Sequence, residues 1–163
     1  MGLFSLLFGN KRKSVAYTTR QGQLVRVDAA FNAWISGDLN KMLKAVHTKT
    51  NPIDRHFLLQ SIVNATYKQR KTEKYRQLCI EYSDLHLKEF PDIAPALKQD
   101  MGGSLPLITT FLNYATVLTE NGEFDIAISI CNKAIKYGLH DNTKSGYEGR
   151  IERIKKKAAK QNA

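Results

Sequence analysis

The stretch FLNYATVLTENGEFDIAISICNKAIKYGLHD, residues 111–141, decides the fold. Its first part carries Ala115 and Leu118 on one helical face. Asn121-Gly122 then supplies a turn, because glycine accepts the positive φ angle that a helix end often needs. After the turn, apolar residues recur every three or four positions, at Phe124, Ala127, Ile128, Cys131, Ala134 and Ile135. This spacing produces a single apolar stripe, so the stretch predicts two helices packed antiparallel across a tight turn.

Several of these residues resemble a tetratricopeptide repeat (TPR), a helix–turn–helix unit of about 34 residues. The family has a small residue midway along the first helix, glycine at the turn, an aromatic residue two positions later and alanines in the second helix. The matching residues here are Ala115, Gly122, Phe124, Ala127 and Ala134. Leu139 stands where the family usually ends on proline, and Tyr114 stands where leucine is more common. The resemblance implies a right-handed array of stacked helix pairs.

Two further helix pairs are expected upstream. Over residues 24–52, small residues line a first helix that begins at Leu24, Gly37 makes the turn, and the second helix ends by Pro52. Over residues 54–91, two apolar stripes flank Arg70-Lys71-Thr72, a turn without glycine, so the repeat register there stays open. A short helix and a loop at Met101-Gly102-Gly103-Ser104 are expected between residues 92 and 106. The array is therefore expected to be unevenly spaced.

The C-terminal part predicts a capping helix over residues 143–160. Tyr147, Ile151 and Ile154 form a narrow apolar stripe there, and the other positions are mostly polar. The last helix of a helical array needs such a polar outer face. Within the 163 residues we therefore predict one all-α domain over residues 21–160, an irregular TPR-like right-handed array made of the units 24–52, 54–91 and 108–141 and the capping helix.

The N-terminal segment, residues 1–20, begins with an apolar stretch over residues 3–8 that is followed by Lys11, Arg12 and Lys13. A secretory signal has the reverse order, with its positive charges before the apolar region. Leu6 stands where a myristoylation signal needs serine or threonine. Packing on the domain, contact with a membrane surface and flexibility all stay open for this segment.

The rest of the composition favours a cytoplasmic protein. No apolar run is long enough to span a bilayer. Cys79 and Cys131, the two cysteines, each lie within an apolar helical pattern, as buried thiols do in a reducing compartment. We expect a folded, cytoplasmic protein.

No catalytic or metal-ligating pattern is present in the sequence. His47, His56, His86 and His140 are scattered, and no paired metal-ligand spacing or glycine-flanked nucleophile accompanies them. The glycine-rich loop near Met101 lacks the lysine of a phosphate-binding loop. We therefore expect no catalytic residues, no metal, no cofactor and no enzymatic activity.

The resemblance implies a binding groove lined by the first helix of each pair. The residues that it places there are Val27, Phe31, Trp34, Asn64, Tyr67 or the adjacent Lys68, Leu112, Asn113 and Thr116. Phe31, Trp34 and Tyr67 are candidate apolar anchors, and the amides of Asn64 and Asn113 are suited to hold an extended peptide backbone. The expected partner is a protein or peptide whose identity the sequence does not give, and pairing with a second copy of the chain stays open.

Two alternatives rest on charge, since the formal net charge is +10. The first is a peripheral membrane adaptor, anchored by the apolar stretch and Lys11–Lys13. The second is nucleic-acid binding through the basic tail, whose charged residues are Arg150, Arg153, Lys155, Lys156 and Lys157. No aromatic residues are interleaved with these charges to stack on bases, which disfavours a nucleic-acid partner.

Overall fold

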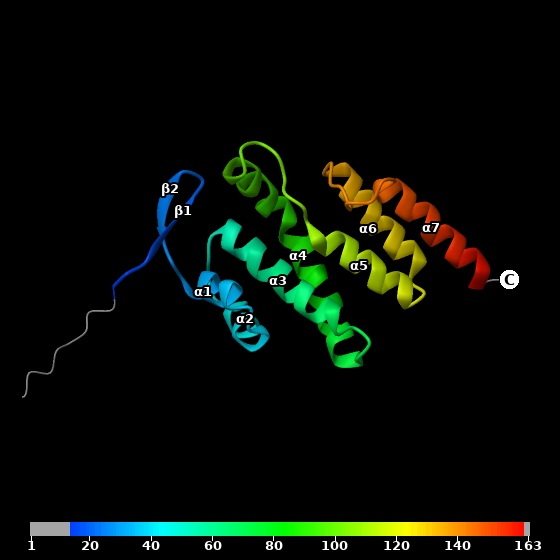
Figure 1. Ribbon diagram of the computed structural model, residues 1–163, viewed down its shortest axis with the longest axis horizontal. Helices are drawn as coiled ribbons and strands as arrows, with labels where there is room; N and C mark the ends of the chain where they lie inside the picture. Colours follow the sequence, from blue (N-terminus) through cyan, green and yellow to red (C-terminus); the bar gives the residue numbers. More distant parts are fainter. Residues whose placement is uncertain (1–13, 162–163) are drawn as a thin grey trace, which may run out of the picture.

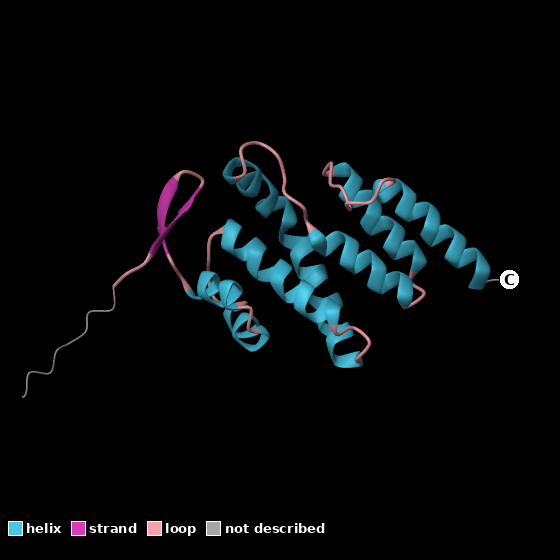
Figure 2. Cartoon of the chain, viewed as in Figure 1, coloured by secondary structure: helices cyan, strands magenta, loops and turns pink. Residues whose placement is uncertain are grey.

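The computed structural model describes residues 14–161, which form a β-hairpin followed by seven helices (Figures 1 and 2). The strands are β1 (Tyr17–Arg20) and β2 (Gln23–Arg26). The helices are α1 (Ala29–Ser36), α2 (Leu39–Ala45), α3 (Pro52–Lys68), α4 (Glu73–Asp100), α5 (Thr109–Glu120), α6 (Phe124–Lys136) and α7 (Gly146–Gln161). The prediction of a mainly all-α fold is confirmed.

The helices pack with their neighbours in the chain. α3 packs against α4, α5 against α6 and α6 against α7, while α1 and α5 both contact α3 (Figure 1). The helix pair predicted over residues 108–141 is present as α5 and α6, joined by a turn in which Gly122 has a φ of 81°. The C-terminal helix expected over residues 143–160 is α7. The TPR-like arrangement itself stays a prediction.

The start of the predicted first unit is wrong, because residues 23–26 form a strand and not the beginning of a helix. Tyr17 pairs with Arg26 and Arg20 with Gln23 in an antiparallel hairpin. Its two turn residues, Gln21 and Gly22, have φ angles of 50° and 76°, as a two-residue hairpin turn of this twist requires. α1 starts only at Ala29, where the Asp28 carboxylate accepts a bond from the Phe31 amide at 2.9 Å.

Part of the predicted N-terminal segment 1–20 is thus a strand, β1. The apolar stretch over residues 3–8 and the basic residues Lys11–Lys13 lie outside the described residues.

The predicted end of the second unit at Pro91 is also wrong, since α4 continues through Pro91 and Pro95 to Asp100. Proline normally ends a helix because it has no amide hydrogen and its ring collides with the preceding turn. Both prolines here are on the exposed side of α4. The opposite side buries Phe90, Ile93 and Leu97 almost completely, and this burial offsets the missing hydrogen bonds.

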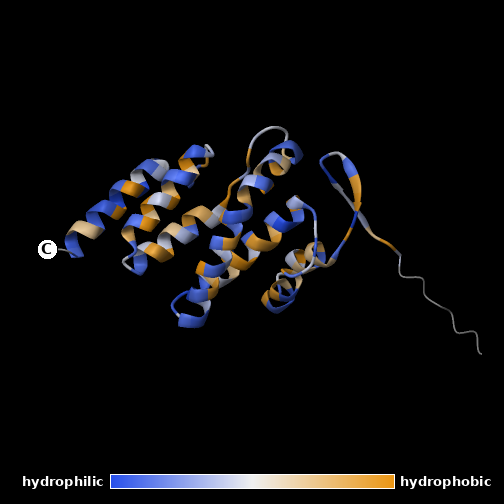
Figure 3. Cartoon of the chain, turned by 180° about the vertical axis from the view of Figure 1, so that it is seen from behind, coloured by the Kyte–Doolittle hydropathy of each residue, from blue (hydrophilic) through white to orange (hydrophobic). Residues whose placement is uncertain are grey.

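Two adjacent clusters of buried side chains hold the helices together. One joins α4, α5, α6 and α7 and includes Phe90, Phe111 and Tyr147. The other joins α1, α2, α3 and the first half of α4 and includes Met42 and Leu59. Figure 3 accordingly shows hydrophobic and hydrophilic positions recurring in turn along the helices. No helix within residues 14–161 combines the length and the apolar character needed to cross a bilayer.

Candidate binding face on α3, α5 and α7

Three helices that are not consecutive in the chain share a polar surface. The name "α3–α5–α7 face" is used here for Asn64 and Tyr67 of α3, Thr109, Leu112, Asn113 and Thr116 of α5, and Arg150, Arg153 and Lys157 of α7. At its centre, the Asn64 Oδ1 atom accepts bonds from the Thr109 hydroxyl at 2.8 Å and from the Asn113 amide nitrogen at 2.9 Å. The predicted pair Asn64 and Asn113, 49 positions apart in the chain, is therefore brought together.

The two asparagines keep unused hydrogen-bonding groups. The Asn64 Nδ2 and Asn113 Oδ1 atoms have no protein partner among the described residues, and neither is among the buried polar atoms that lack one. Asn64 is half-buried, and Asn113 is 6% exposed, so the Asn113 amide is accessible only at the edge of the pair. The Asn64 atom is a donor and the Asn113 atom an acceptor, the two groups needed to pair with a peptide unit of an extended chain.

Towards α7, the same face becomes basic. The Thr116 hydroxyl accepts a bond from Arg150 Nη1 at 3.1 Å, and Arg150 Nε donates to the Asp141 carboxylate at 3.0 Å. Burial alone raises the pKa of Asp141, but hydrogen bonds from Thr143 and Arg150 outweigh it and hold that pKa below its ordinary value. A hollow of about 230 Å³ lies between the two helices, lined by Thr116, Thr119, Glu120, Arg150, Arg153, Ile154 and Lys157.

Tyr67 is connected to this hollow through Arg70, which covers its ring and pairs with Glu120 of the hollow. The Arg70 guanidinium sits 4.0 Å from the centroid of the Tyr67 ring and makes a bidentate pair with Glu120, at 2.9 and 2.8 Å. The hydrogen bond from Arg70 lowers the pKa of Glu120. One face of the Tyr67 ring is thus covered, and the predicted aromatic anchor is half-buried.

The three predicted groove residues nearest the N-terminus are not part of this face. Val27 lies between β2 and α1 and not on a first helix; its amide donates to the Ala16 carbonyl at 2.9 Å. Phe31 packs edge-on against Trp34, and Trp34 stacks on Phe57 with 5.0 Å between ring centroids. Both α1 side chains are partly buried in the structure.

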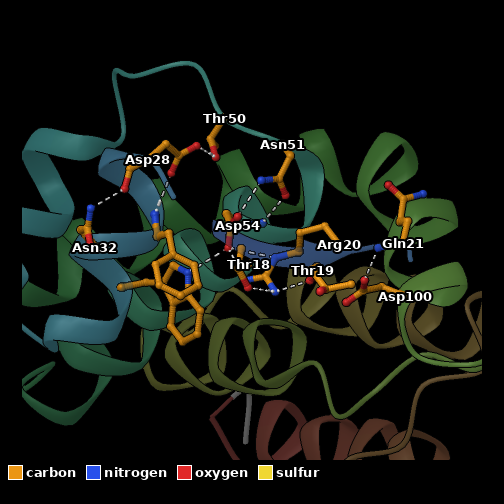
Figure 4. Close-up of polar contacts among 12 residues, drawn as sticks. Thr18, Thr19, Arg20, Gln21, Asp28, Asn32, Thr50, Asn51, Asp54 and Asp100 are labelled. Carbon is orange, nitrogen blue, oxygen red and sulfur yellow. Dashed lines mark hydrogen bonds and ion pairs between the residues drawn. The ribbon is translucent and has the colours of Figure 1, made fainter. Parts of the chain in front are cut away.

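Trp34 belongs to a cluster around a buried carboxylate, Asp54, which is 1% exposed. The Asp54 Oδ1 atom accepts bonds from Arg20 at 2.6 Å and from the Trp34 indole at 3.2 Å, and Oδ2 accepts from Asn51 at 2.6 Å. Figure 4 shows Arg20 and Asn51 converging on Asp54 from different elements. The Gln21 amide also donates to Asp100, so the hairpin is fixed to the helices at two places. The sequence does not predict this cluster, because nothing in the local pattern around Arg20 or Asp54 indicates the contact.

Some residues of the predicted basic tail bond to neighbouring side chains, and others do not. Arg150 pairs with Asp141, Arg153 donates to the Ser145 hydroxyl at 3.0 Å, and Lys155 pairs with Glu152 at 3.0 Å. Lys156 and Lys157 are exposed and form no ion pair within the described chain.

A buried pair of histidines was not expected from the sequence. His56 Nδ1 lies 3.0 Å from His86 Nε2, and His86 Nδ1 lies 2.7 Å from the Thr110 hydroxyl. Burial lowers the pKa of His56 to about 4 and places the pKa of His86 well below its ordinary value. One hydrogen fits between His56 Nδ1 and His86 Nε2, so only one of these two nitrogens carries a proton. Because both pKa values are lowered, both rings are neutral at neutral pH.

Among the described residues, no three histidine, cysteine, aspartate or glutamate side chains gather closely enough to hold a metal ion.

The comparisons with known proteins give one distant relative. No family model matches the chain, and no solved structure matches it. A protein of Aquifex aeolicus (strain VF5), described as an uncharacterized protein, is 27% identical over 143 residues. The match covers 81% of this chain and 66% of the relative, so the chain spans just under two thirds of that protein's length.

Proposed function

We propose that the chain is a protein-interaction module without enzymatic activity, and that it binds a peptide or a helix of a partner protein across the α3–α5–α7 face. The observation that carries this proposal is the Asn64–Asn113 pair, joined at 2.9 Å, in which the Asn64 Nδ2 donor and the Asn113 Oδ1 acceptor have no partner among the described residues. The two amide groups lose little conformational entropy when they align with a peptide backbone, because the hydrogen bond between them already fixes their orientation.

The charge on α7 favours an acidic partner segment. Arg153 and Lys157 line the hollow next to Thr116, and the charge of Lys157 contributes to the lowered pKa of Glu120. Glu120, the only carboxylate in that lining, is already paired with Arg70. A carboxylate of the partner would therefore meet unbalanced positive charge at this end of the face.

Affinity capture from an extract of the native cell tests the proposal. The wild type is compared with Asn64→Ala/Asn113→Ala, which removes both sides of the internal hydrogen bond and is expected to fold normally. The partner captured by the wild type is expected to bind the variant at least tenfold more weakly, because the groups that align its backbone are gone. Binding is measured with the purified partner after its identification by mass spectrometry.

The matched control is Asn40→Ala/Asn132→Ala, two exposed asparagines on α2 and α6 outside the proposed face. It should retain the partner in full. A partner held equally well by the wild type and both double variants would rule out the α3–α5–α7 face as its binding site.

A second candidate function, a membrane-peripheral adaptor, is favoured by the outer surface of the hairpin. Val15, Tyr17 and Leu24 are 48%, 61% and 76% exposed there, and Arg26 is the strand partner of Tyr17. Aromatic and aliphatic side chains beside basic residues are the combination that binds an anionic bilayer surface.

Sedimentation with vesicles containing phosphatidylserine tests this second candidate. Tyr17→Ser/Leu24→Ser is expected to lower the vesicle-bound fraction several-fold, since it removes the apolar contact. The control Ile35→Ser/Ile126→Ser alters two similarly exposed apolar side chains on α1 and α6 and should not change it. The adaptor hypothesis is contradicted if the wild type does not bind the vesicles, or if both variants bind them as strongly as the wild type does.

A further inference from the structure

A separate apolar cleft lies between α4 and α6, over the side of α5 that faces away from Asn113. It has a volume of about 410 Å³ and is lined by Leu87, Pro91, Phe111, Lys133, Lys136 and Tyr137. Its aromatic members are held in place: the Tyr137 ring meets Phe90 edge-on at 4.8 Å between centroids, and Phe90 meets Phe111 at 5.2 Å. The volume is within the range of small-molecule sites, which are mostly apolar with a few polar groups.

The cleft continues along the two helices into a second hollow. This hollow, of about 470 Å³, shares Leu87 and Lys133 with the first and adds Asp84, Leu85, Lys88 and Ile130. Its one carboxylate, Asp84, accepts a bond from the neutral Tyr114 hydroxyl at 2.6 Å and keeps its negative charge, which offsets one of the two lysine charges of this second hollow. The two hollows together form an elongated apolar surface with positive charge at its edge.

Within the first hollow, the positive charge of Lys133 and Lys136 is not balanced by a carboxylate. Lys133 and Lys136 are three residues apart on α6, so both ammonium groups are on the same side of that helix. No carboxylate lines the first hollow, and the ion pairs of the described residues include neither lysine. An anion is therefore the chemical complement of this edge of the cleft.

The cleft and the α3–α5–α7 face are distinct. At about 100° per residue, Asn113 and Thr116 lie roughly 140–160° around α5 from Phe111. Phe111 is 1% exposed and turns towards α4 and α6, whereas Thr116 bonds to Arg150 of α7. A ligand in the cleft would leave the proposed protein-binding face open.

We propose that the α4–α6 cleft binds a straight-chain carboxylic acid, with its carboxylate between Lys133 and Lys136 and its hydrocarbon chain over Pro91, Tyr137 and Leu87. The elongated shape favours a flexible chain, and the paired lysines favour an anionic head group. The remaining edge is open, so the ligand enters without movement of a helix.

Isothermal titration calorimetry of the full chain with octanoate, and with 1-octanol as the uncharged analogue, tests the site. Octanoate is expected to bind at one site. 1-Octanol is expected to bind about tenfold more weakly, because it lacks the two solvent-screened charge pairs that the carboxylate makes with the lysines. Lys133→Gln/Lys136→Gln is expected to reduce octanoate affinity by the same factor and to leave 1-octanol binding unchanged. Both lysines are exposed, so the variant should fold normally.

The control is Lys41→Gln/Lys44→Gln on α2, which removes two exposed lysines with the same spacing and lowers the net charge equally. It should bind octanoate like the wild type. Absence of octanoate binding, equal binding of 1-octanol, or equal losses in the two lysine variants would each overturn the proposal. Because the α4–α6 variant keeps Asn64 and Asn113, its capture of a protein partner should be unaffected, which separates this test from that of the protein-binding face.

Discussion

Replacing Asp54 with alanine is expected to destabilise the protein by about 3–5 kcal/mol, because the substitution leaves a buried cation without its partner. Arg20 is 12% exposed in its side chain and bonds to Asp54 at 2.6 Å, so the charge of Arg20 would stay in a site that excludes most water. The Trp34 indole and the Asn51 amide would lose an acceptor at the same time. The hairpin should detach from the helices as a result.

Urea unfolding followed by far-ultraviolet circular dichroism measures this loss. Asp125→Ala is the matched control, because Asp125 is also in the first turn of its helix, α6, but is exposed. Asp125→Ala measures only the loss of the favourable interaction between a carboxylate and the helix dipole, about 0.3–1 kcal/mol. If Asp54→Ala and Asp125→Ala lose similar stability, Asp54 does not fix the hairpin to the helices.

Acidification from pH 6.5 to pH 4 is expected to remove about 3 kcal/mol of stability through His56. Burial lowers its pKa from 6.5 to about 4. Between these two pH values, His56 is protonated in the unfolded chain and neutral in the folded chain, so acid favours unfolding. The stability is therefore complete above pH 6.5 and is lost as the pH falls towards 4. His86, whose pKa is lowered by burial and by the charges of His56 and Arg55, adds a loss in the same direction.

The free energy of unfolding in urea, measured at several pH values, checks the contribution of the pair. His56→Gln/His86→Gln should be less stable at pH 7.5 and should show a much shallower decline between pH 6.5 and 4. His47→Gln/His140→Gln, which alters two exposed histidines, should follow the wild type. If the free energy of unfolding of His56→Gln/His86→Gln falls with pH in parallel with that of the wild type, the buried histidines do not govern acid sensitivity.

The sequence predicted the elements whose signals are local. α5, α6 and α7 each carry an apolar stripe of helical period, and Gly122 marks the turn between the first two. The hairpin was missed because its strands are four residues long, although Gln21-Gly22 between β-branched and aliphatic residues was a usable signal. The end of α4 was misplaced because burial of Phe90 and Leu97, which depends on tertiary contacts, outweighs the effect of Pro91.

The sequence predicts only those residues of the α3–α5–α7 face that lie on helices with a clear local signal. Asn64, Asn113 and Thr116 were chosen from their positions on first helices, and the structure brings them onto one face with α7. Val27 and Trp34 lie away from this face, because the hairpin that precedes α1 supplies Arg20, which meets Trp34 at Asp54. The His56–His86 pair joins α3 to α4 across 30 residues, a separation that no local pattern reveals.

The most direct test of the central proposal is the affinity of a captured partner for the wild type and for Asn64→Ala/Asn113→Ala, with Asn40→Ala/Asn132→Ala as control. We expect at least a tenfold loss of affinity in the first variant and none in the second, with equal helicity in all three proteins. An unchanged affinity in the folded Asn64→Ala/Asn113→Ala variant would contradict a binding role for the α3–α5–α7 face.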